Sequence, residues 1–105
     1  MNIQDLFNLD KKTAFISGGA TGIGRMAAEA MAMAGARVLI ASRKGSACAS
    51  VAEEINQKGY KGIVESFEGD LSSETGIEAL VKEIKIRTGK LNILMNNSAQ
   101  LLQYT

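Results

Sequence analysis

Short apolar runs alternate along this chain with longer stretches whose apolar residues recur at helical spacing. The first run, Thr13–Ser17, predicts a buried strand, and a glycine-rich turn follows it. The next apolar residues have the i, i+3, i+4, i+7 spacing of one helix face: Ala27, Ala30, Met31 and Ala34. Gly35 predicts the end of that helix, and Arg37–Ser42 is apolar and β-branched enough for a second buried strand.

The same order of helix and strand occurs twice more. One predicted helix ends at Gly59 and has an apolar face of Cys48, Val51, Ala52 and Ile55. The other ends at Gly89, has Ser72 or Ser73 as its candidate N-cap, and has an apolar face of Ile77, Leu80, Val81 and Ile84. Strand candidates follow at residues 62–67 and 92–96. Alternating strands and helices predict an α/β fold with a parallel sheet of four strands.

Composition narrows the class of protein and of site. The 105 residues suit one domain, and 46% hydrophobic with 22% charged residues is ordinary for a soluble globular protein. A net charge of +1 and the absence of a basic run argue against binding to nucleic acid or to an anionic membrane. No histidine and one cysteine make a metal site improbable and exclude an internal disulfide.

Two further expectations come from the apolar residues. No apolar run nears bilayer length and the N-terminus lacks the pattern of a secretion signal, so a cytoplasmic location is the default. Soft side chains fill gaps in a core far more often than they do chemistry. We therefore expect core packing for Met26, Met31, Met33 and Cys48.

The most informative stretch is the turn after the first strand. It consists of Ser17, Gly18, Gly19, Ala20, Thr21, Gly22, Ile23 and Gly24. Glycines between a strand and a helix let a pyrophosphate approach the N–H groups and the dipole of the helix N-terminus. The turn lacks the Lys-Ser/Thr ending of a P-loop, which argues against a nucleotide triphosphatase. The alternative is a tight turn with no ligand, but its place in a β-α-β unit favours phosphate binding.

The end of the second strand indicates which dinucleotide would bind. A carboxylate there would hydrogen-bond the hydroxyls of the adenosine ribose, but Ser42, Arg43 and Lys44 occupy this place instead. A hydroxyl and a guanidinium suit a ribose 2′-phosphate, so NADP(H) is favoured over NAD(H), FAD and S-adenosylmethionine. The alternative is that the two cations are solvated turn residues.

Polar residues also follow the third and fourth strands. Asp70 and Leu71 follow one, and Asn96 and Asn97 end the other, at the edge where open α/β sheets bind ligands. Asp70 is an equally good candidate for capping the next helix, and the asparagines for forming a turn.

Together these motifs resemble the short-chain dehydrogenase/reductase family, with the closest likeness to its 3-oxoacyl-(acyl carrier protein) reductase-like members. The resemblance rests on Ser17-Gly18-x-x-x-Gly22-Ile23-Gly24, Asp70-Leu71 and Asn96-Asn97-Ser98-Ala99, and it covers about residues 7–99. It implies a Rossmann-type, doubly wound sheet in order 3-2-1-4, with NADP(H) over the glycine turn. It also implies Ser42 and Arg43 near the 2′-phosphate, Asp70 and Leu71 beside the adenine, and Asn97 beneath the ribose on the nicotinamide side.

The sequence departs from the family in two places. Ala99 stands where the family has glycine, which adds a β-carbon to the turn. The family's catalytic serine and Tyr-x-x-x-Lys pair lie downstream of this motif, and neither Tyr60 nor Tyr104 has a lysine four residues later, so no catalytic residue is assigned. A fragment, a frameshift product and an alternative terminus all remain open.

The resemblance implies that the parent protein is an oxidoreductase, expected to be a homo-oligomer. It would move hydride between NADP(H) and a carbonyl or a secondary alcohol, such as a 3-oxoacyl thioester. The alternative is a catalytically inactive fragment that binds the cofactor or interacts with a longer relative. On either view the resemblance implies that residues 1–105 are the NADP-binding part of a domain, and we expect its catalytic half to be absent from them.

Overall fold

The computed structural model describes residues 8–18, 22–43 and 45–96, in which strands and helices alternate. The elements are β1 (Thr13–Ser17), α2 (Gly22–Met33), β2 (Arg37–Ser42), α3 (Gly45–Asn56), β3 (Ile63–Glu68), α4 (Glu74–Arg87) and β4 (Ile93–Asn96). The predicted α/β class is confirmed. The first two strands have the predicted bounds, and β3 and β4 each begin one residue later than predicted.

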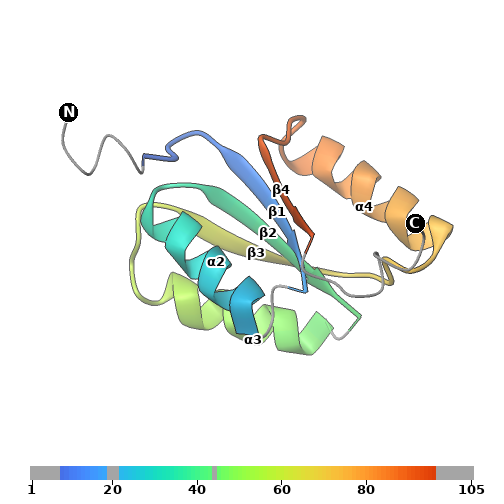
Figure 1. Cartoon of the computed structure of the whole chain (residues 1–105), viewed down its shortest axis with the longest axis horizontal. Helices are drawn as coiled ribbons and strands as arrows, with labels where there is room; N and C mark the ends of the chain where they lie inside the picture. The colour runs from blue at the N-terminus through green and yellow to red at the C-terminus, as the bar shows by residue number, and fades with distance from the viewer. Residues whose placement is uncertain (1–7, 19–21, 44, 97–105) are drawn as a thin grey trace.

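The strands form one parallel sheet in the order β3-β2-β1-β4, as predicted. Phe15 of β1 pairs with Leu39 of β2 on one side and with Leu94 of β4 on the other. Helices α2 and α3 lie on one face of the sheet and α4 lies on the opposite face (Figure 1). The chain therefore forms three layers.

Each face of the sheet packs against its helices in a separate core. Ile16, Val38 and Ile40 point toward α2 and α3, whereas Phe15 and Leu39 point toward α4, because successive side chains of a strand face opposite ways. On the α2 and α3 face the helices supply Ala28, Ala32, Cys48, Val51, Ala52 and Ile55. On the α4 face the other buried members are Ala41, Leu71 and Leu80. Strand β2 is covered on both faces, which explains its continuous apolar run.

The helix ends follow from local chemistry. Gly35, Gly59 and Gly89 have φ angles of 104°, 73° and 69°, a region that residues with a β-carbon rarely adopt, so all three predicted helix ends are confirmed. At the start of α4, Ser73 is the N-cap and its side chain accepts a hydrogen bond from the backbone N–H of Gly76. Of the two candidate caps, the structure selects Ser73.

The predicted buried face of α2 is wrong in part. The buried residues are Gly24, Ala28 and Ala32, while Ala30 is exposed. Met26 and Met33 are 71% and 56% exposed, so the core packing expected for them is also wrong. Small residues let the backbone of α2 approach the sheet closely, and this places the long methionine side chains on its outward side. Met31 is partly buried and Cys48 is fully buried, as expected.

The predicted face of α4 is also only partly correct. Leu80 is buried and Ile84 packs against it, but Ile77 and Val81 are exposed. In α3, by contrast, all four predicted apolar residues are buried. The sequence pattern gives the spacing of apolar residues, whereas burial also needs a neighbouring element to cover them.

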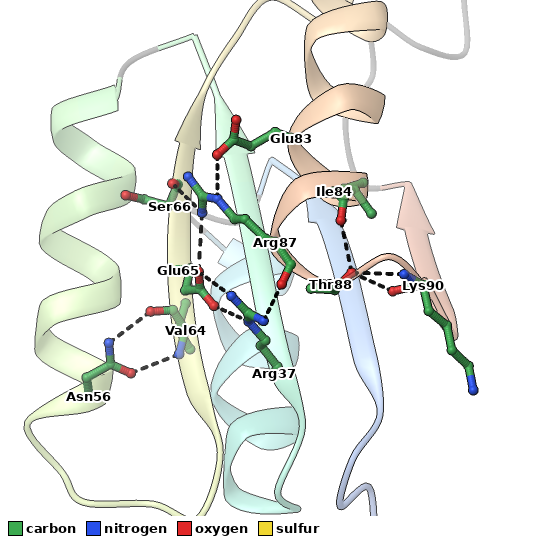
Figure 2. Close-up of polar contacts among 10 residues, drawn as sticks. All are labelled: Arg37, Asn56, Val64, Glu65, Ser66, Glu83, Ile84, Arg87, Thr88 and Lys90. Carbon is green, nitrogen blue, oxygen red and sulfur yellow. Dashed lines mark hydrogen bonds and ion pairs between the residues drawn. The ribbon is translucent and has the colours of Figure 1, made fainter.

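A charged network ties the end of α4 to β2 and β3 (Figure 2). Arg37 donates to both carboxylate oxygens of Glu65, with Nη2 at 3.1 Å from Oε1, and its Nη1 donates to the carbonyl oxygen of Arg87 at 2.8 Å. Arg87 in turn pairs with Glu65 at 3.4 Å and with Glu83 at 2.7 Å. The hydrogen bond from Arg37 is the main reason why the pKa of Glu65 lies below its ordinary value.

We expect Glu65→Gln to lower the free energy of unfolding near pH 7 by about 1–2 kcal/mol, the scale of a charged hydrogen bond that is partly solvated. Because the pKa of Glu65 is depressed in the folded state, its contribution is present above the unfolded pKa of about 4.3 and is lost as the pH falls through the lower folded value. Urea unfolding at pH 7 and near pH 3 measures this, with Glu53→Gln on the exposed side of α3 as control. An equal loss at both pH values would contradict the assignment.

Candidate functional site

The carboxyl ends of all strands meet at one edge of the sheet. Ser17 at the end of β1 pairs with Ala41 of β2 and with Asn96 of β4, and Ser42 at the end of β2 pairs with Glu68 of β3. The chain order reverses across β1, since β2 lies on one side of it and β4 on the other. Open α/β sheets bind ligands in the crevice at such a switch point. The residues that end β1, β2 and β4 thus surround the start of α2.

The two described ends of the glycine turn have backbone angles that glycine tolerates best. Gly18 has φ of 67° and its N–H donates to the carbonyl oxygen of Ala41 at 3.0 Å. Gly22, the first residue of α2, has φ of 57°, and a β-carbon built on it would meet no atom of the described residues within 4 Å. Gly24 is buried against the sheet and Ile23 is exposed. The other candidates of the turn, Gly19, Ala20 and Thr21, lie outside the described residues.

The start of α2 has the electrostatics of an anion site. The first turn of any α-helix carries N–H groups without partners inside the helix, and the helix dipole adds partial positive charge. No acidic side chain lies in the first turn of α2 to oppose this charge. Among the described residues, the start of α2 thus shows neither a steric nor a charge conflict with a phosphate-sized anion.

Ser17 joins the ends of β1 and β4. Its side chain is fully buried, and its hydroxyl donates to the Oδ1 atom of Asn96 at 3.2 Å. The resemblance had placed Ser17 in the cofactor turn. In the structure its described contact is with β4, so it fixes the position of the strand end that precedes Asn97.

Arg43 and Asp70, predicted as two separate cofactor contacts, lie next to each other. The Nε atom of Arg43 is 3.4 Å from Oδ1 of Asp70, and its Nη2 donates to Oγ of Ser72 at 3.3 Å. Hydrogen bonds from Ser72, and then the nearby Arg43, hold the pKa of Asp70 below its ordinary value. Asp70 therefore does not cap α4; it accepts from the backbone N–H of Ser72 and orders the turn before the helix.

Two partners of these residues were not singled out by sequence reasoning. Ser72 was considered only as a helix cap, and it binds both Asp70 and Arg43. Cys48 was considered only as core, and its thiol donates to Oγ of Ser42 at 3.1 Å. Burial raises the pKa of the Cys48 thiol, so it stays protonated and remains a donor. Ser72 follows Asp70 at the spacing of an Asx turn, and this is a signal that the sequence offered.

The remaining candidates divide between the core and the undescribed part of the chain. The side chain of Leu71 is buried with Phe15 and Leu39 in the core under α4. Asn97 and Lys44 lie outside the described residues. Within residues 8–18, 22–43 and 45–96, no group of acidic, cysteine or histidine side chains is arranged to hold a metal ion, and no helix is long and apolar enough to cross a membrane.

Comparison with known proteins decides the family. Residues 12–103 match the family model described as short chain dehydrogenase, which takes in every described strand and helix. The chain belongs to the short-chain dehydrogenase family. The resemblance inferred from the sequence motifs is therefore confirmed.

Individual relatives differ in what their names record. The rhamnolipids biosynthesis 3-oxoacyl-[acyl-carrier-protein] reductase of Pseudomonas aeruginosa is 37% identical over 88% of this chain and 35% of its own length. The oxidoreductase YxbG of Bacillus subtilis is 40% identical over 86% of this chain and 32% of its own. The chain thus spans about a third of the length of the curated relatives it matches.

Solved structures similar to this chain include one complex with NADP and one with NADH. The Pseudomonas aeruginosa RhlG/NADP active-site complex superposes with a TM-score of 0.82 at 36% identity, over 93% of this chain and 38% of that one. A 7α-hydroxysteroid dehydrogenase complexed with NADH superposes with a TM-score of 0.80 at 35% identity, over 90% of this chain and 36% of that one. Similarity alone therefore does not select the phosphorylated cofactor.

Proposed function

We propose that this chain is the NADP(H)-binding domain of an oxidoreductase that moves hydride between the nicotinamide and a carbonyl or secondary alcohol. The observation that carries the choice of cofactor is Arg43, which stands directly after β2 where an NAD(H) site has a carboxylate. The name of one relative, a 3-oxoacyl-[acyl-carrier-protein] reductase, suggests 3-oxoacyl thioesters as the first substrate class to test.

In this proposal, different residues of the site would contact different parts of the cofactor. The pyrophosphate would lie over the turn from Ser17 to Gly24 and the start of α2, where glycine leaves the approach open. Arg43, with Ser42 beside it, would hold the 2′-phosphate. Asp70 and the backbone of Leu71, whose side chain is buried under α4, would border the adenine. Asn97 would lie beneath the second ribose. When bound, NADP(H) supplies the hydride, and the described residues bind and orient it.

A second candidate function is considered because the chain spans about a third of the length of its relatives. In it, this polypeptide binds the cofactor without catalysing a reaction, or interacts with a longer relative. Turnover by the purified chain separates the two functions, and nucleotide binding is common to both.

We expect Arg43→Ala to remove most of the preference for NADP(H) over NAD(H). A charged hydrogen bond contributes about 1.5–3 kcal/mol, so the ratio of the two dissociation constants should fall by about tenfold or more. Fluorescence titration with NADPH and NADH measures the ratio, below the concentration at which light scattering detects association. Arg25→Ala, which breaks an ion pair with Glu54 between α2 and α3, is the matched control. Equal affinity of the unmutated chain for both cofactors would refute the choice of NADP(H).

A further inference from the structure

Strand β3 is the terminal strand of the sheet on one side, and its outward edge has backbone groups that β2 does not use. Successive residues of a strand direct their N–H and C=O groups to opposite neighbours. Ile63 donates to Ala36 on the β2 side, so Val64 and Ser66 direct theirs outward. An outward edge of this kind is a template for another strand.

The side chain of Asn56 hydrogen-bonds the outward backbone groups of β3 at Val64. Asn56 is the last residue of α3, and its Nδ2 donates to the carbonyl oxygen of Val64 at 2.8 Å while its Oδ1 accepts from the N–H of Val64 at 2.9 Å (Figure 2). A carboxamide has the same donor and acceptor as a peptide unit. Asn56 therefore makes both hydrogen bonds that one residue of an added antiparallel strand would make.

A second side chain reaches the same edge from the other face of the sheet. Nη1 of Arg87, in α4, donates to the carbonyl oxygen of Ser66 at 3.4 Å (Figure 2). The next outward carbonyl along β3 is thus engaged as well, by a helix on the opposite layer. Side chains from α3 on one face of the sheet and from α4 on the other thus bind the outward edge of β3.

The edge that an added strand would pair with lies beside a groove. A groove between α3 and β3 is lined by Ala52, Asn56, Ile63 and Val64 among others. Ile63 is 48% exposed, so the edge offers an apolar contact next to its backbone groups. The sequence of β3, Ile-Val-Glu-Ser-Phe-Glu, is rich in strand-forming residues. Neither shape nor composition would prevent pairing here.

We propose that Asn56 is an edge-closing residue, which keeps β3 from pairing with a strand of another molecule by occupying the backbone groups of Val64. Arg87 has the same role at Ser66. The chain then has one closed sheet edge, and association by strand pairing is directed away from β3. This inference does not depend on the proposed nucleotide site, which lies at the carboxyl ends of the strands.

The experiment measures whether a peptide strand binds to the edge of β3, and whether removal of the Asn56 side chain strengthens that binding. The probe is a labelled, end-blocked peptide with the sequence of residues 62–69, and its binding is followed by fluorescence anisotropy. Asn56→Ala should bind the peptide about tenfold or more tightly than the unmutated chain, because two hydrogen bonds become available to it. Hydrogen exchange of the Val64 amide should accelerate in the same variant. Ser50→Ala, at an exposed position of α3 that does not line this groove, is the control and should behave like the unmutated chain.

Binding of the peptide at other places, such as β4, is common to all variants and cancels in the comparison. Should Asn56→Ala fail to fold, Asn56→Asp serves instead, because its carboxylate still accepts from Val64 N–H but has no hydrogen to donate to the carbonyl; its peptide affinity should rise by a smaller factor. Faster exchange of the Val64 amide with unchanged peptide affinity would overturn the inference, since Asn56 would then only fasten α3 to the sheet.

Discussion

Gly22→Val is expected to abolish binding of NADP(H) and NAD(H) alike, a loss of at least about a hundredfold in affinity. The branched side chain would project from the start of α2, where no described atom lies within 4 Å of an added β-carbon and where we propose that the pyrophosphate approaches the backbone. Removal of the phosphate contacts costs several charge-assisted hydrogen bonds at once, each about 1.5–3 kcal/mol. The affected step is binding, so the loss should not depend on which cofactor is offered.

Backbone strain must be separated from this steric effect. Gly22 has φ of 57°, a conformation that costs a β-branched residue stability wherever it occurs. Gly59, between α3 and β3, has φ of 73° and also has no atom within 4 Å of an added β-carbon. Gly59→Val therefore introduces a similar backbone strain at the other end of the sheet, where the strands begin. Thermal unfolding should show similar destabilisation of both variants, and calorimetric titration should show lost binding only for Gly22→Val. A folded Gly22→Val that keeps its affinity would place the cofactor elsewhere.

The backbone fold could be predicted from the sequence because its signals are local. Glycines at 35, 59 and 89 end the three helices, and each has the positive φ that glycine tolerates best. The continuous apolar run of β2 indicated a strand covered on both faces, and Val38, Leu39, Ile40 and Ala41 are all buried. The strand order came from the family resemblance, since no local signal fixes which strands become neighbours.

Burial on the helices could be predicted only where a partner lies close by. Helix α3 packs along β2 and β3, and its predicted apolar face is buried. Ile77 and Val81 of α4 have the same spacing but are exposed, because periodicity does not say whether another element covers a helix face. Met26 shows the same limit on α2.

The candidate site was predictable as a set of residues but not as a set of contacts. The glycine turn and Arg43 were identified from their places at strand ends. The pairing of Arg43 with Asp70 and Ser72 was not, since these residues come from loops 27 or more positions apart that only the β2–β3 pairing brings together. Such contacts depend on tertiary structure, which a linear pattern does not contain.

A polypeptide of residues 1–105 is expected to associate in solution and to show no turnover. Association follows from exposed apolar side chains and from the unpaired edge of β4, the terminal strand of the described sheet opposite β3. Leu94 of β4 is 67% exposed, and Met26 of α2 and Val81 of α4 are exposed as well. Contiguous exposed apolar surface next to a strand edge promotes association between molecules. Light scattering should give a mass above that of a monomer at micromolar concentrations.

Leu94→Lys should shift this polypeptide toward the monomer, because a buried charge at the contact is costly and an edge lysine opposes strand pairing. Ser50→Lys adds the same charge to an exposed position of α3, away from β4, and should leave the mass unchanged.

The absence of turnover has a separate cause. Neither tyrosine of the sequence has a lysine four residues later, so the family's Tyr-x-x-x-Lys proton donor has no counterpart here. Loss of a positioned acid commonly costs about 10²–10⁴-fold in rate. NADPH oxidation with a panel of ketones and 3-oxoacyl thioesters tests this directly. A monomer with measurable turnover would show that these residues supply both a closed surface and a proton donor that we have not identified.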